Sequence, residues 1–239
     1  MQKTKMMEMY MAKLAVRVAV FIAVLAMYIY DKNMILQLLN RPLYMGVNFM
    51  HMLWFGFMAM MVSHLWPKQP FTMACLKSIE YRPVEDYSRL EMLEYTQRQN
   101  QKAWQVMLVW LLGNGLVGIL HAVEILDNAD MIMLSVFYFL CDYICILFYC
   151  PFQSHIMKNK CCVNCRIYDW GHFMMFTPML FINSFYSLSL FFMACIVLLH
   201  WELIYARHPE RFYAGSNKHL QCTHCKDKTC QIKRKLAKK

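Results

Sequence analysis

The stretch HFMMFTPMLFINSFYSLSLFFMACIVLLHWELIYA, residues 172–206, is the longest apolar run of the chain. At 1.5 Å per residue, a continuous helix of this length would measure about 50 Å, well beyond a hydrocarbon core of about 30 Å. Asn183, Ser184 and Ser187 interrupt the run with polar side chains. The interruption predicts two membrane segments, 173–186 and 188–206, of which the first is short or re-entrant.

The rest of the chain has the composition of an integral membrane protein. Of its 239 residues, 59% are hydrophobic and 17% are charged. Four further apolar runs approach or exceed the length of a membrane span, namely 13–30, 43–66, 104–126 and 131–151. The first is too long for the apolar region of a signal peptide, so we expect a retained anchor. We predict an all-α fold: a polytopic transmembrane helix bundle of about six segments with a small cytoplasmic cysteine-rich metal site.

Two polar insertions and a tail accompany these segments. They are a loop at 67–103, a cysteine-rich loop at 152–172 and a basic, cysteine-rich tail at 207–239, which follows the helical domain 1–206. Ser88, followed by Glu91, resembles a capping box and predicts that a polar helix starts there and runs into the third membrane segment.

The distribution of basic residues predicts the orientation of the chain. The tail carries ten of the 25 lysines and arginines against only Glu210 and Asp227, a net charge of +8 out of +10. Because basic segments stay on the cytoplasmic side, we expect the tail, the N-terminus and the 67–103 loop to be cytoplasmic, which requires an even number of crossings. The expected partners are a bilayer with an anionic inner leaflet and unidentified proteins, and not nucleic acid.

Two cysteine pairs with the same two-residue gap flank the long apolar run: Cys162 with Cys165, and Cys222 with Cys225. Two such pairs supply the four thiolates of a tetrahedral site for zinc or iron. Cys161 and Cys230 are alternative ligands. The two pairs can share an ion only if they lie on the same side of the membrane.

Zinc is the expected metal, because a closed zinc site stabilises polar segments that have little core of their own. This predicts a scaffold or assembly protein rather than an enzyme. An iron-sulfur cluster on the same thiolates is the alternative, and it would make the protein a membrane redox component and an oxidoreductase. The 23 methionines, with the thiolates, leave a soft-metal transporter as a further alternative.

Polar residues within the apolar runs form a second group of candidates. Asp142 is an ionisable residue inside a predicted span, and we expect its protonated carboxyl to bond Asn114 of the preceding segment, with a proton or ion relay as the alternative. His51 and His121 fall toward the outer ends of their segments, where paired histidines could ligate a haem.

Overall fold

The chain folds into a bundle of helices. The computed structural model describes residues 5–44, 46–66, 77, 81–159, 161, 164–224 and 230. Four of its helices have the length and composition of membrane spans: α1 (Lys5–Tyr30), α5 (Arg89–Ala122), α6 (Asn128–Leu147) and α8 (Phe185–Arg207). The predicted all-α class is therefore confirmed, and the four helices agree with a membrane protein.

Shorter elements connect these helices. The apolar helix α3 (Phe49–Leu65) has only 17 residues, and it follows a small antiparallel hairpin of β1 (Pro42–Tyr44) and β2 (Val47–Asn48). Helix α2 (Asn33–Asn40) lies between α1 and this hairpin. The other elements are α7 (Gly171–Phe176), the π-helix η1 (Phe152–Met157) and the 3-10 helices η2 (Tyr168–Trp170), η3 (Thr177–Phe181), η4 (Pro209–Phe212) and η5 (Lys218–Leu220).

The long helices α5 and α6 both start at capped ends. Ser88 accepts a hydrogen bond from the backbone N–H of Glu91 at 3.3 Å, and α5 then runs unbroken for 34 residues, as the capping pattern predicts. At the start of α6, Asp127 and Asp130 each accept a hydrogen bond from the other's backbone N–H. Lys32 pairs with both carboxylates from the end of α1, and its pKa is raised, chiefly by its hydrogen bond to Asp130.

The long apolar run breaks where its polar residues predict a division. Its first part forms α7 and η3, separated from α8 by an extended turn at Ile182 and Ser184. Pro178 lies near the start of η3, where its missing N–H is tolerated. α8 begins at Phe185, so the division falls a few residues before the predicted boundary.

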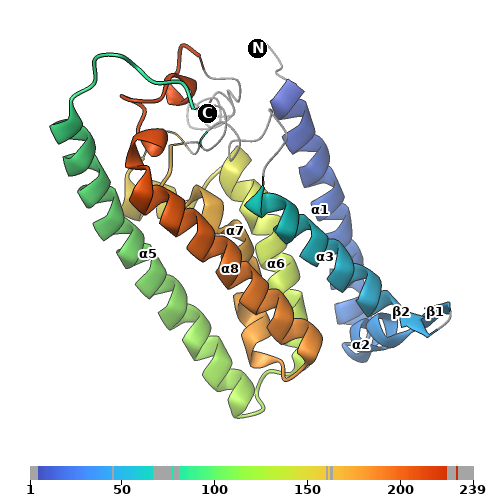
Figure 1. Cartoon of the computed structure of the whole chain (residues 1–239). Helices are drawn as coiled ribbons and strands as arrows, with labels where there is room; N and C mark the ends of the chain where they lie inside the picture. The colour runs from blue at the N-terminus through green and yellow to red at the C-terminus, as the bar shows by residue number, and fades with distance from the viewer. Residues whose placement is uncertain are drawn as a thin grey trace, which may run out of the picture.

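The two parts of this run take different positions in the bundle (Figure 1). α8 packs against α3 and α7, while η3 contacts α5, α6 and α8. α1 packs mainly on α6 at the side of the bundle. The broken part of the run, formed by α7 and η3, therefore lies at the centre with long helices around it, and we call it the central segment.

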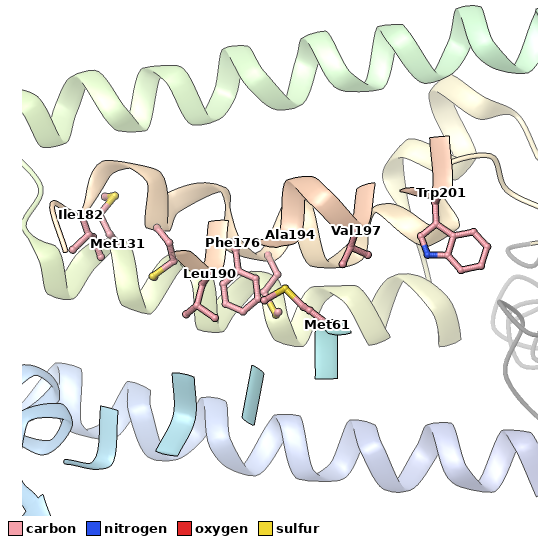
Figure 2. Packing of buried hydrophobic residues seen from close by; sticks show 10 residues of the cluster. Met61, Met131, Phe176, Ile182, Leu190, Ala194, Val197 and Trp201 are labelled. Atoms are coloured by element: carbon pink, nitrogen blue, oxygen red, sulfur yellow. The ribbon is translucent and has the colours of Figure 1, made fainter. Parts of the chain in front are cut away.

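The main apolar cluster surrounds this broken part (Figure 2). Phe176 and Met179 from the broken part meet Met61 of α3, Met131 of α6 and Leu190 of α8. Trp201, 2% exposed, closes the cluster near the C-terminal end of α8. In a lipid environment these contacts hold α3, α6 and α8 around the central segment by van der Waals packing, because lipid tails are as apolar as the side chains.

The outward faces of the long helices are apolar. α5 exposes Trp104, Leu112 and Leu116, each at 60% or more, and only 6% of the apolar window of α1 is buried. Apolar faces of this extent match a lipid environment rather than water. The helices thus have two apolar sides, one facing the bundle and one facing outward.

Candidate functional site

One end of the bundle collects most of the polar interactions, and we call it the basic end. It consists of the N-terminal end of α1, the first turns of α5, residues 161 and 164–170, and residues 209–224 (Figure 1). Tyr10 of α1 hydrogen-bonds Tyr168 at 3.0 Å. Residues 81–84 pair with residues 216–218, through an antiparallel bridge between Pro83 and Asn217. The opposite end, formed by α2, the hairpin and the turn before α6, is called the hairpin end.

The two cysteine-bearing segments meet at the basic end. Asn164 donates a hydrogen bond to the backbone carbonyl of Leu220 at 3.3 Å, one residue before Cys165 and two residues before Cys222. Cys161 and Leu220 also belong to one apolar cluster, which is built around α1 and α6. The structure therefore holds side by side the two segments that carry the predicted ligands.

The metal site itself is described only in part. Cys165 is buried and Cys222 is exposed, whereas Cys162 and Cys225 lie outside the described residues. Within the described part of the chain, no group of three or more histidine, cysteine or carboxylate side chains is arranged to hold a metal ion. The four-thiolate site, with Cys161 and Cys230 as alternative ligands, stays a prediction.

A buried ion pair fastens the loop before α7. Lys77 and Asp169 are 3.0 Å apart, with side chains only 2% and 6% exposed. The Lys77 ammonium also lies 4.8 Å from the centre of the Tyr168 ring and 5.5 Å from that of Phe212. A charge pair buried this deeply is costly to break from one side, because the remaining charge loses both water and its partner.

A second ion pair joins the loop to the last turns of α8. The guanidinium of Arg166 donates to both carboxylate oxygens of Glu202, and its Nε donates to Asn100 at 3.1 Å. The indole N–H of Trp170 donates to the same carboxylate at 2.8 Å. The ring of Tyr205 lies 3.7 Å from the guanidinium carbon. Bidentate pairing and ring stacking are both particular to arginine.

The intramembrane carboxylate Asp142 has a different partner from the predicted one. Arg17 of α1 donates to it at 2.8 Å and also to the backbone carbonyl of Phe139. The guanidinium stacks between the rings of Phe139 and Tyr143, at 4.0 and 3.9 Å from their centres. The predicted hydrogen bond from Asp142 to Asn114 is therefore wrong, because an arginine in α1 satisfies the carboxylate more strongly than an amide would.

Asn114 is instead used locally. Its amide donates to the carbonyl of Trp110 one turn earlier, and its oxygen accepts a long bond of 3.4 Å from Tyr138. The small residues beside it serve different purposes: Gly118 lies against the ring of Phe181, whereas Gly113 and Gly115 face open space. Only one of these glycines thus allows a close approach.

The relay alternative for Asp142 is less well supported than a structural role. Buried polar groups do occur between Asp142 and the hairpin end, since Tyr138 hydrogen-bonds Asn114 and Ser135 is 6% exposed. The carboxylate of Asp142 is, however, engaged by the Arg17 guanidinium at 2.8 Å. The ion pair therefore favours a structural role for Asp142.

The two histidines predicted as haem ligands lie in α3 and α5, toward the hairpin end. His51 accepts from the backbone N–H of Asn48 through Nδ1, and its Nε2 is 2.8 Å from the hydroxyl of Tyr186. His121 hydrogen-bonds Asn128 at 3.1 Å. A haem iron would have to displace one of the partners of His51. Among the described residues, two histidine rings lie near each other elsewhere: His64 and His172, with centres 5.0 Å apart and planes tilted by 55°.

Three charged residues of these pairs could have been found in the sequence. Arg17 and Glu202 are isolated charges inside apolar runs, a pattern that indicates a buried partner. Asp142 carries the same signal and was singled out. Lys77 and Asp169 lie in polar segments, where the sequence gives no reason to prefer them over their neighbours.

No family of known proteins, no curated protein and no solved structure matches this chain. The functional argument therefore comes from the geometry of the basic end.

Proposed function

We propose that the protein is a multi-pass membrane scaffold or assembly protein whose basic end is fastened by a cysteine-bound zinc ion. The observation that carries the proposal is the hydrogen bond from Asn164 to Leu220, which joins the segments bearing the two cysteine pairs. A metal bound there would link the loop before α7 to the chain after α8.

We infer six membrane crossings. The four long helices supply four, and α3 and the α7–η3 segment supply the other two. Consecutive crossings run in opposite directions in Figure 1, so the start of α1 and the end of α8 lie at the same end. The net charge of +8 in residues 207–239 favours the cytoplasm for that end.

A structural role suits the charged groups around the cysteines. The Glu202 carboxylate accepts from both Arg166 and Trp170, and Lys77 is directed at Asp169. Groups committed to protein partners in this way hold segments in place. A closed zinc site would add to the same task, since metal binding contributes folding free energy.

Metal content tests this proposal. Purified full-length protein should contain one zinc ion per chain and be colourless, and Cys165→Ser and Cys222→Ser should each lose the metal. Cys195→Ser, in the middle of α8, is the matched control and should keep it. Protein without any bound metal, or variants that retain zinc, would contradict the proposal.

The same preparation separates the alternatives. Iron with acid-labile sulfide and a brown colour would favour the redox component instead. Soft-metal transport would appear as uptake of zinc or monovalent copper into proteoliposomes that contain the protein. We expect neither the colour nor the uptake.

A further inference from the structure

A small cavity lies at the basic end where α5, the loop before α7, α8, η4 and Lys77 meet. Tyr95 and Gln99 of α5, Asn164 and Cys165 of the loop, Tyr205 of α8 and Phe212 of η4 line it, together with Lys77 and Arg166. Its volume is about 10 Å³, which is room for one molecule the size of water. Any occupant is therefore a single small species.

Two residues that line the cavity carry side-chain hydrogen-bond acceptors that have no partner among the described residues. These are the side-chain oxygens Oε1 of Gln99 and Oδ1 of Asn164, both fully buried. The Gln99 side chain is on a residue only 7% exposed, so bulk water does not reach it. Buried acceptors without a donor are costly, and native structures usually satisfy them with an ordered water molecule.

The charges around the cavity indicate which kind of molecule can bind in it and donate to these two oxygens. Lys77 and Arg166 are both cations, and their carboxylate partners, Asp169 and Glu202, are engaged in ion pairs. A metal or ammonium ion would be repelled by these two side chains. A neutral molecule with two protons to donate fits the acceptors without that repulsion.

We propose that this cavity is a binding site for one structural water molecule. The water donates one proton to Gln99 Oε1 and the other to Asn164 Oδ1, and its lone pair accepts from a Lys77 proton not directed at Asp169. It thereby links α5 to the cysteine-bearing loop and to the segment that contains Lys77.

The variant Gln99→Met tests the site, because methionine has a similar size and no acceptor. If water occupies the cavity, the variant deprives it of a partner, and the melting temperature of the full-length protein falls by a few degrees. If the cavity is dry, the same change removes an unsatisfied acceptor, and the melting temperature stays equal or rises.

Ser135→Ala is the matched control. Its hydroxyl is also buried without a partner among the described residues, but it lies in α6 and does not line the cavity. Its melting temperature should be unchanged or higher, and an equal fall in both variants would overturn the proposal.

A density map of the wild-type protein gives an answer even where Gln99→Met fails to fold. At a resolution that shows ordered water, we expect one peak within hydrogen-bonding distance of both oxygens. An empty cavity, or side chains that close it by bonding each other, would overturn the proposal.

Discussion

The two parts of the apolar run 172–206 make opposite use of similar side chains. α8 is a regular helix of 23 residues that has one face against the bundle and exposes Phe192, Ile196 and Leu199 on the other. The α7–η3 segment changes helix type after six residues, yet Phe173, Phe176 and Met179 are all buried. The less regular part is the more enclosed one.

The difference follows from where backbone polar groups can be satisfied. In hydrocarbon only a continuous helix bonds all its own N–H and C=O groups, so irregular backbone at membrane depth must be covered by protein. α8 meets the first condition and can face lipid. The α7–η3 segment meets the second, because α5, α6 and α8 surround it.

The largest effect is expected from breaking the Arg166–Glu202 pair, which joins the loop before α7 to α8 at the basic end. Glu202→Leu removes the carboxylate that binds both Arg166 and Trp170, and leaves a guanidinium that is 7% exposed without its counter-charge. We expect a loss of about 3–5 kcal/mol in the free energy of unfolding, measured by denaturant titration in detergent.

A hydrogen-bonded pair at the surface provides the control for this variant. Glu210 pairs with His208, whose side chain is 45% exposed. Glu210→Gln should therefore cost less than about 1 kcal/mol. Equal losses in Glu202→Leu and Glu210→Gln would show that the Arg166–Glu202 pair contributes no more to stability than a surface contact.

A smaller loss is expected where the central segment begins. Asp142 Oδ1 lies 2.8 Å from the position that a Cβ on Gly171 would occupy, so the Arg17–Asp142 pair packs directly against the first residue of α7. Asp142→Asn should cost about 1.5–3 kcal/mol, because the Arg17 guanidinium keeps an acceptor but loses its counter-charge.

The double variant Arg17→Leu with Asp142→Leu distinguishes a charge effect from a packing effect. Replacing both partners of a buried pair by apolar groups is often neutral. We expect the double variant to recover most of the stability that Asp142→Asn loses. A double variant that is less stable than Asp142→Asn would mean that the two side chains contribute more than mutual neutralisation of charge.

Enclosure makes the central segment sensitive to added volume. A Cβ on Gly118 of α5 would overlap ring atoms of Phe181 in η3, so Gly118→Ala should cost about 1–2 kcal/mol. Gly115→Ala, one turn away with nothing within 4 Å, should be neutral or gain up to about 1 kcal/mol from helix propensity. Thermal unfolding of the two variants side by side measures the contrast.

The smallest effect compares one hydrogen bond in each part. The indole N–H of Trp110 donates to Thr177 in the central segment at 3.0 Å, and that of Trp54 donates to Ser189 in α8 at 2.8 Å. Thr177 is 3% exposed and Ser189 is half-buried. Thr177→Val should cost about 1–1.5 kcal/mol and Ser189→Ala about 0.5 kcal/mol in the same titration, because only the first leaves a donor away from solvent.

The sequence predicts the fold class and the break in the long run because hydrophobic length and polar interruptions act locally. Ser88 and Glu91 likewise mark the start of α5 through neighbours three residues apart. Burial is different, since apolar residues in α1 and in α7 look alike until the surrounding helices are known. This is why the most enclosed segment could not be recognised from composition.

The candidate site was predictable to a lesser extent. The spacing of the cysteine pairs predicts Cys165 and Cys222 as metal ligands. In the structure, the hydrogen bond from Asn164 to Leu220 holds their segments together. The partner of Asp142 was missed because depth in antiparallel helices pointed to Asn114, while the stronger partner, Arg17, comes from a helix far away in sequence.

The most direct test of the account is the membrane sidedness of the segments on either side of 172–206. Reporter fusions after residue 164 and after Lys239 should both report the cytoplasmic side, and a fusion after Asn128 should report the opposite side. This result would mean that the broken segment and α8 each cross the membrane once. Fusions at 164 and 239 on opposite sides would contradict the six-pass arrangement and exclude a metal ion shared by the two cysteine pairs.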